Sequence, residues 1–160
     1  MVPASLAIRV SQLEPYVIKV LDFLQKRLVA DLSDFNVVTI VGRPKSSQSI
    51  FQKLQTGKYE SVSELTDLAA LTVVVLYRKD VQSALEIVKA SGLVVVDEPT
   101  RAVAATDFRY REPKIYVTPP AEYLDRNPEL VGIVAEVQFT SALQHALDMT
   151  THNFDYKGQS

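Results

Sequence analysis

Short runs of β-branched residues alternate with longer amphipathic segments along most of this chain, and this alternation limits the folds open to it. NVVTIVG (36–42) and LVVVDE (93–98) are two of the short runs, and such residues are enriched in strands. Between the runs, apolar residues recur at helical spacing, as in residues 13–32 and 79–92. Helical segments separate the first of these runs, whereas the last runs are expected to be joined by hairpin-like turns. The pattern predicts a mixed sheet with helices packed on it.

We therefore expect the order helix, strand, helix, strand, helix, strand, strand, strand, helix. Ser46 or Ser47 is the expected N-cap of the second helix, and Gly57 is expected to end it. The predicted helices cover 13–32, 45–57, 79–92 and 141–156, the strands 36–42, 71–77, 93–98, 114–120 and 132–139, and the connections 99–113 and 121–130. The length of 160 residues fits one domain. We divide it into a helical lead (1–35) and a core (36–158).

Composition excludes several classes of function. The formal net charge of −2 argues against a general binder of nucleic acids or membranes. The chain has no cysteine, which excludes disulfides and thiolate chemistry, and its 2 histidines are too few for a site built on several histidine ligands. It contains neither an apolar run of about 18 residues nor a recognisable signal peptide. We expect a cytoplasmic protein that does not bind membranes.

The segment GRPKSSQSIFQKL (42–54) places basic residues around a predicted helix start. Arg43 and Lys45 lie just before the helix and Lys53 lies within it. Backbone N–H groups at a helix N-terminus, together with Arg and Lys side chains, form a suitable phosphate site. The alternative is a solvated basic turn before an ordinary helix. The segment is not a P-loop, because the Gly-x4-Gly-Lys-Ser/Thr pattern is absent.

Two carboxylates stand near predicted strands. Asp67 precedes the strand at 71–77, where it is either a Mg²⁺ ligand or a turn residue. Glu136 lies inside an apolar strand and shares a face with Gln138 and Thr140, because residues two apart point the same way. A charged group there is costly unless it is paired or binds a metal, or unless that face is half-exposed. Together, Asp67 and Glu136 could hold one metal while the basic residues hold phosphates, as phosphoryl-type transfer requires.

The histidines form the remaining candidate site. His145 and His152 lie two helical turns apart and so share one face of the last predicted helix. No third metal ligand accompanies them, and we therefore interpret both as hydrogen-bonded packing residues.

These segments, in this order, resemble the synthetase domain of the RelA/SpoT alarmone synthetases. GRPKSSQSIFQKL is similar to the family's Arg-x-Lys-Ser-x-x-Ser-Ile-x-x-Lys segment, TDLAALTVVV (66–75) to its aspartate before a strand, and EVQFTSALQHALDMTTHNFDYK (136–157) to its Glu-x-Gln motif and following helix. The resemblance covers about residues 40–158. It implies an α+β fold, with a mixed five-stranded β-sheet flanked by α-helices, as in nucleotidyltransferases. It also implies a Mg²⁺-dependent pyrophosphokinase that transfers the β,γ-pyrophosphate of ATP to the 3′-hydroxyl of GTP or GDP.

The resemblance also implies roles for individual residues. Asp67 and Glu136 are the catalytic acidic residues and Mg²⁺ ligands, and Glu136 is also a candidate to activate the 3′-hydroxyl. The implied nucleotide-binding residues are Arg43, Lys45 and Lys53 at the ATP phosphates, Gln138 beside the acceptor, and Tyr110, in FRYREPKIYV (108–117), stacked on the acceptor base.

The chain departs from the family pattern at several of these positions. Thr72 and Thr140 stand where the family has arginines, and threonine cannot neutralise a phosphate as a guanidinium does. Glu112 and Lys114 replace a serine and a histidine in the acceptor loop. The partners implied are ATP and a guanine nucleotide, or another nucleotide or a tRNA 3′ end, and a homo-oligomer is left open. The alternative function is a catalytically degenerate domain that binds nucleotide or a protein.

Overall fold

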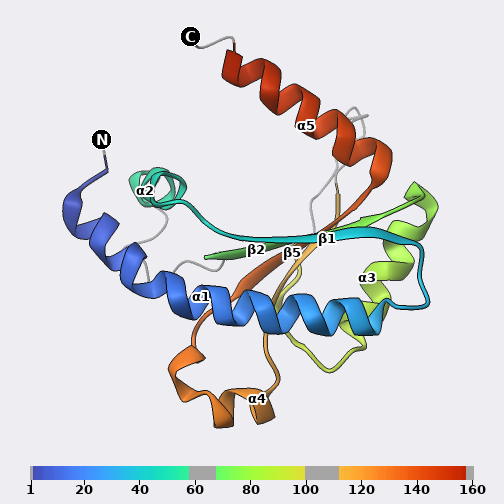
Figure 1. Cartoon of the computed structure of the whole chain (residues 1–160), viewed down its shortest axis with the longest axis horizontal. Helices are drawn as coiled ribbons and strands as arrows, with labels where there is room; N and C mark the ends of the chain where they lie inside the picture. Colours follow the sequence, from blue (N-terminus) through green and yellow to red (C-terminus); the bar gives the residue numbers. More distant parts are fainter. Residues whose placement is uncertain (1, 58–67, 100–111, 158–160) are drawn as a thin grey trace.

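A five-stranded sheet forms the centre of the fold, with a long helix packed along it (Figure 1). The structure is a computed structural model that describes residues 2–57, 68–99 and 112–157, and the side chains of these residues as far as Thr151. The strands are β1 (Val37–Pro44), β2 (Ala69–Val75), β3 (Val94–Asp97), β4 (Lys114–Thr118) and β5 (Ala135–Ser141). Their order in the sheet is β1-β2-β5-β4-β3.

The sheet is mixed, as predicted. The central strands β2 and β5 run parallel, whereas β1–β2, β4–β5 and β3–β4 are antiparallel pairs. Helix η2 (Arg78–Asp80) and helix α3 (Val81–Lys89) follow β2 in the chain. The α+β fold with a mixed five-stranded sheet flanked by helices is thus confirmed.

Helix α1 (Ala4–Asp31) begins nine residues before the predicted start at residue 13 and covers one face of the sheet. It buries an apolar stripe at helical spacing, made of Val17, Val20, Leu21, Leu24 and Leu28. These side chains pack in one core cluster with alternate residues of the strands, Val137 and Phe139 of β5 among them, and with α3. Because the side chains of a strand alternate between faces, the other face of β5 is left to polar residues.

The shorter helices begin and end where local chemistry predicts. Helix α2 (Ser47–Gln55) is capped by Ser46, whose hydroxyl accepts a hydrogen bond from the backbone N–H of Ser49 at 3.2 Å. Gly57 follows this helix with a φ of +75°, and Gly92 follows α3 with a φ of +91°. Both conformations favour glycine, which lacks the Cβ that would be strained there.

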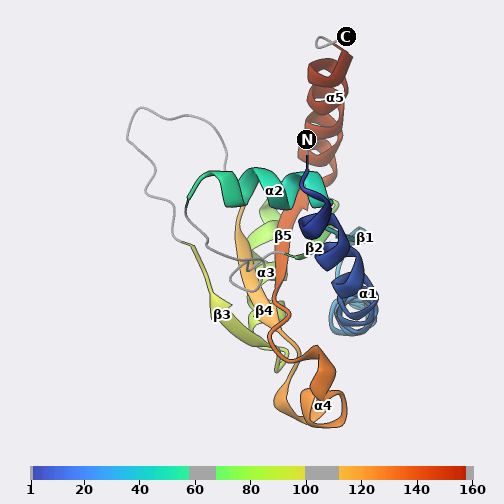
Figure 2. The same cartoon turned by 90° about the vertical axis from the view of Figure 1, so that its left-hand side faces the viewer.

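The segment 121–130, predicted as a connection without a helix, was predicted wrongly. This segment forms helix α4 (Ala121–Arg126) and helix η3 (Pro128–Leu130). Tertiary packing stabilises it, because the Tyr123 ring stacks on Phe23 of α1 with ring centroids 3.9 Å apart. Figure 2 shows α4 at the far end of the molecule from the last helix, α5 (Ala142–Lys157), which continues from β5 and extends away from the sheet.

No helix in the described part of the chain is both long and apolar enough to cross a membrane.

Candidate functional site

The candidate site lies on the sheet face opposite the α1 core. Three residues of β5, Glu136, Gln138 and Thr140, point to this face, as their spacing predicts. Glu136 and Gln138 are half-buried, whereas Thr140 is only 1% exposed. The predicted grouping of these three side chains on one face is therefore found in the structure.

Strand register brings further residues to the same face. Across the sheet, Glu136 pairs with Ala70 of β2 and with Tyr116 of β4. One step further along β5, Gln138 pairs with Thr72 on one side and Lys114 on the other. Thr72, where the family has an arginine, thus lies directly beside the Glu-x-Gln motif.

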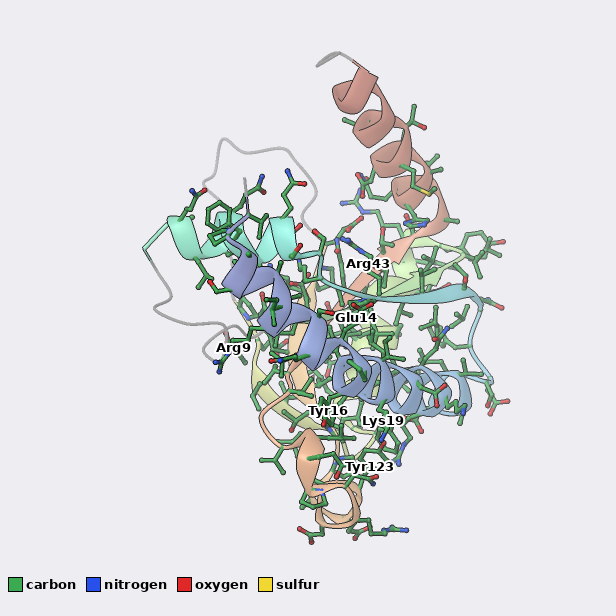
Figure 3. The ribbon with its side chains drawn as sticks, turned by 60° about the vertical axis from the view of Figure 1, so that its left-hand side comes forward. Arg9, Glu14, Tyr16, Lys19, Arg43 and Tyr123 are labelled. Carbon is green, nitrogen blue, oxygen red and sulfur yellow. The ribbon has the colours of Figure 1, made fainter. Side chains whose placement is uncertain are left out.

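The basic segment predicted to hold phosphates begins at the edge of this face. Arg43 is the seventh residue of β1, because that strand extends two residues beyond its predicted end. Arg43 pairs with Ala70 and is exposed, and Figure 3 shows it between α2 and the base of α5. The register therefore places Arg43, Ala70 and Glu136 in one row across three strands.

The other two predicted phosphate ligands lie beyond Arg43. Lys45 and Lys53 are half-buried at the start and in the last turn of α2. The backbone N–H of Lys45 donates to the carbonyl oxygen of Leu68 at 2.9 Å. This bond holds the start of α2 against the segment that leads into β2.

Two predicted site residues, Asp67 and Tyr110, lie outside the described residues. The joint binding of one metal by Asp67 and Glu136 therefore stays a prediction, as does the stacking of Tyr110 on a base. Among the described residues, no three acidic or histidine side chains are grouped so that they could hold a metal ion. The Glu136 carboxylate is compatible with a Mg²⁺ ion, which often takes only one or two protein carboxylates and completes its coordination with water and substrate phosphates.

Tyr116 contacts the central carboxylate. Its hydroxyl lies 3.5 Å from Oε2 of Glu136, at the outer limit of a hydrogen bond. No sequence pattern singles out Tyr116, although its register opposite Glu136 follows once β4 and β5 are paired.

Glu112 contacts two polar side chains of this face. Its carboxylate accepts hydrogen bonds from the amide Nε2 of Gln138 and from the hydroxyl of Thr140. Burial raises the pKa of Glu112 above that of an ordinary glutamate, and the nearby carboxylate of Asp148 on α5 raises it further, while the two hydrogen bonds lower it. The sequence identified Glu112 only as a departure from the family pattern.

Lys114 supplies a positive charge to the same row as Thr72 and Gln138. Its ammonium nitrogen lies 5.7 Å from the centre of the Tyr116 ring, within the range of a cation–π contact. No ion pair joins it to a carboxylate in the parts of the chain that the structure describes. In the sequence, Lys114 was noted only because it replaces a histidine of the family pattern.

The two histidines do not join the site as far as it is described. His145 is half-buried on α5, and its ring makes no hydrogen bond to another described residue. The side chain of His152 lies outside the described set, so its predicted packing role stays a prediction.

Comparison with known families shows where this chain belongs. Residues 42–160 match the family described as "Region found in RelA / SpoT proteins". This match covers most of the chain, including Arg43 at the end of β1 and the whole of β5 with Glu136. The chain belongs to the RelA/SpoT family.

Solved structures agree with this fold. The small alarmone synthetase 1 from Bacillus subtilis aligns with a TM-score of 0.72 at 19% identity, over 93% of this chain and 80% of that one. The same synthetase bound to its product pppGpp aligns with a TM-score of 0.71 at 19% identity, over 94% and 82% of the two chains. A GTP pyrophosphokinase family protein from Streptococcus pneumoniae aligns with a TM-score of 0.69 at 23% identity, over 93% and 77%. No curated protein sequence matches the chain significantly.

Proposed function

We propose that this chain is a Mg²⁺-dependent pyrophosphokinase that transfers the β,γ-pyrophosphate of ATP to the 3′-hydroxyl of GDP or GTP. The observation that carries the proposal is the half-buried Glu136 carboxylate on the polar face, in one row with Arg43, in a chain of the RelA/SpoT family. We treat residues 1–160 as one synthetase domain that works in the cytoplasm, where both nucleotides are available.

In the proposed reaction, the acceptor 3′-oxygen attacks the β-phosphorus of ATP and the bond between that phosphorus and the α,β-bridging oxygen breaks. AMP leaves, and Glu136 accepts the proton of the 3′-hydroxyl as a general base. Asp67 and Glu136 would hold Mg²⁺, which neutralises phosphate charge and orients the phosphates when it is bound. Most of the catalysis is then positioning and charge neutralisation.

Positive side chains lie at both sides of the row that contains Glu136, and they could neutralise the negative phosphates of ATP, the pyrophosphate donor. Arg43 lies at its β1 end, with Lys45 and Lys53 beyond it. Lys114 on β4 adds a positive charge in the same row as Thr72 on β2, with β5 between them. Neighbouring strands lie about 4.8 Å apart, so the two backbones are roughly 10 Å apart. We propose that Lys114 takes over part of the phosphate contact that an arginine at position 72 would make.

The nucleotides assigned here are of the kind bound by similar structures. The small alarmone synthetase 1 from Bacillus subtilis has been solved with its product pppGpp and with AMPCPP. We extend this class of ligand to the present chain. The alternative acceptors are another nucleotide or a tRNA 3′ end, and a screen of acceptors tests them.

The direct test is release of AMP from ATP in the presence of Mg²⁺ and each candidate acceptor. We expect AMP formation with GDP or GTP, reduced at least about 100-fold in Glu136→Gln, since a general base contributes about 10²–10⁴-fold. Glu122→Gln on the exposed surface of α4 is the matched control and should retain full activity. Absence of AMP with every acceptor would refute the proposal.

One observation favours a second candidate function, a domain that binds nucleotide or a protein without turnover. Thr140 is buried, and its hydroxyl donates to Glu112, so an anionic side chain lies beside the position where the family has an arginine. Calorimetry separates the two functions. Nucleotide binding without AMP release supports the second function, and absence of nucleotide binding leaves an interaction role.

A further inference from the structure

Two hydrogen-bond acceptors lie side by side at the centre of the polar face. Glu136 and Gln138 are two residues apart on β5 and point the same way, so their backbones are separated by about 7 Å. Both side chains are half-buried. Each is also contacted by a residue from the β4 side, and these contacts decide which atoms remain available to a ligand.

Glu112 determines the orientation of the Gln138 amide. When ionised, the Glu112 carboxylate only accepts hydrogen bonds, and Nε2 of Gln138 donates to it, so it faces the amide NH₂ group and not the carbonyl oxygen. The same carboxylate accepts from Thr140, which occupies its other oxygen. The carbonyl oxygen Oε1 of Gln138 is consequently turned away from Glu112, and no other described residue donates to it.

Glu136 lies on the opposite side of Gln138 from Thr140 and has a longer contact with a residue of β4. The hydroxyl of Tyr116 approaches Oε2 of Glu136 at 3.5 Å. Its second oxygen, Oε1, makes no hydrogen bond to another described residue. One carboxylate oxygen and one amide oxygen, on residues two apart on the same face of β5, thus remain for a ligand that carries two donors.

We propose that Glu112 is a positioning residue that fixes Gln138, so that Gln138 and Glu136 together accept the 2′- and 3′-hydroxyls of a ribonucleotide. A ribose cis-diol has two adjacent O–H donors and fits such a pair of acceptors. This assignment rests on the proposed function for Glu136 and the 3′-hydroxyl, and it adds the 2′-hydroxyl as the partner of Gln138. It also gives Glu112 a role in selecting ribonucleotides over deoxyribonucleotides.

The first experiment concerns the protein without ligand. In an NMR spectrum, the side-chain NH₂ signals of Gln138, assigned by their loss in Gln138→Ala, should shift with pH together with the Glu112 carboxyl. This pH response should vanish in Glu112→Gln and persist in the control Glu122→Gln. If the chemical shifts of the Gln138 NH₂ signals change neither with pH nor in Glu112→Gln, the positioning role of Glu112 is overturned, whatever the protein binds.

The second experiment measures binding of GDP and of 2′-deoxy-GDP by calorimetry. We expect the intact protein to bind GDP about tenfold more tightly, because a site built to accept a hydroxyl proton discriminates against its absence. The preference should fall below about twofold in Gln138→Ala and in Glu112→Gln, since a glutamine at position 112 both donates and accepts and no longer dictates the amide orientation. Glu122→Gln should keep the full preference.

The outcomes separate the parts of the proposal. Equal binding of the two nucleotides by the intact protein overturns the diol assignment. A preference that is lost in Gln138→Ala but kept in Glu112→Gln overturns the role of Glu112. If neither nucleotide binds while the NMR response of Gln138 is present, the proposed function and the diol assignment both fail, and the Glu112–Gln138 contact stands.

Discussion

Replacing Thr140 by valine tests the polar contacts of this face through stability alone. Valine has nearly the shape of threonine, so the change removes a hydroxyl from a position that is only 1% exposed without opening a cavity. The lost group donates to the Glu112 carboxylate. The ionised carboxylate then keeps the hydrogen bond from Gln138 and loses this one.

The expected cost follows from the charge of the acceptor. A hydrogen bond to a charged group contributes about 1.5–3 kcal/mol, and because Glu112 is only half-buried we expect about 1–2 kcal/mol. For a chain of this length that cost corresponds to a fall in Tm of roughly 2–8 °C. A protonated Glu112 would lose only a neutral hydrogen bond, at about 0.5–1 kcal/mol.

The cost should therefore depend on pH in a defined direction. Burial already raises the pKa of Glu112 in the folded protein, whereas the hydrogen bond from Thr140 lowers it. Removing that bond raises the folded pKa further and leaves the unfolded pKa unchanged. The variant then loses stability relative to the parent protein as pH rises through the folded pKa, and the added cost disappears below the unfolded pKa.

Urea denaturation followed by circular dichroism at about pH 8 and about pH 4 brackets the ordinary glutamate pKa of about 4.3. Thr39→Val on β1, where the side chain is exposed, is the matched control and should change stability by less than about 0.5 kcal/mol at both pH values. A cost for Thr140→Val that is equal at the two pH values, or larger at the lower one, would refute the reasoning.

Substitutions at three further positions test the fold that carries the site. A Cβ added by Gly42→Ala would lie 2.9 Å from Cδ2 of the buried Leu71, so we expect a loss of about 1–3 kcal/mol in urea denaturation; unchanged stability would show that Leu71 moves aside freely. Phe139→Ala empties a fully buried core position and should cost about 3–5 kcal/mol in the same assay, and a cost near 1 kcal/mol would contradict the packing described. Ser46→Ala removes the cap that accepts from Ser49 and should cost about 1 kcal/mol by thermal melting, whereas Ser46→Gly should cost only a few tenths.

Local periodicity was sufficient for much of the architecture. Alternation along β5 predicted that Glu136, Gln138 and Thr140 share a face, and the register confirms it. An N-cap at Ser46 or Ser47 and a helix end at Gly57 were also predicted, and the structure has Ser46 as the cap, since capping and positive φ depend on neighbouring residues only.

Local patterns failed where stability comes from distant contacts. Residues 121–126 were predicted to be part of a polar connection, yet they form α4, whose Tyr123 stacks on Phe23 of α1. The predicted end of β1 at residue 42 left Arg43 in a turn. Pairing with Ala70 of β2 extends the strand and places Arg43 in the Glu136 row.

The sequence by itself determined that β5 has one apolar and one polar face, because side-chain direction in a strand is set by the backbone of that strand. It also determined that a basic segment precedes a capped helix. Only the tertiary structure decided that Glu112, 26 residues before Gln138, reaches its amide, and that Thr72 and Lys114 flank it. These neighbours come from the pairing of separate strands, which no local pattern specifies.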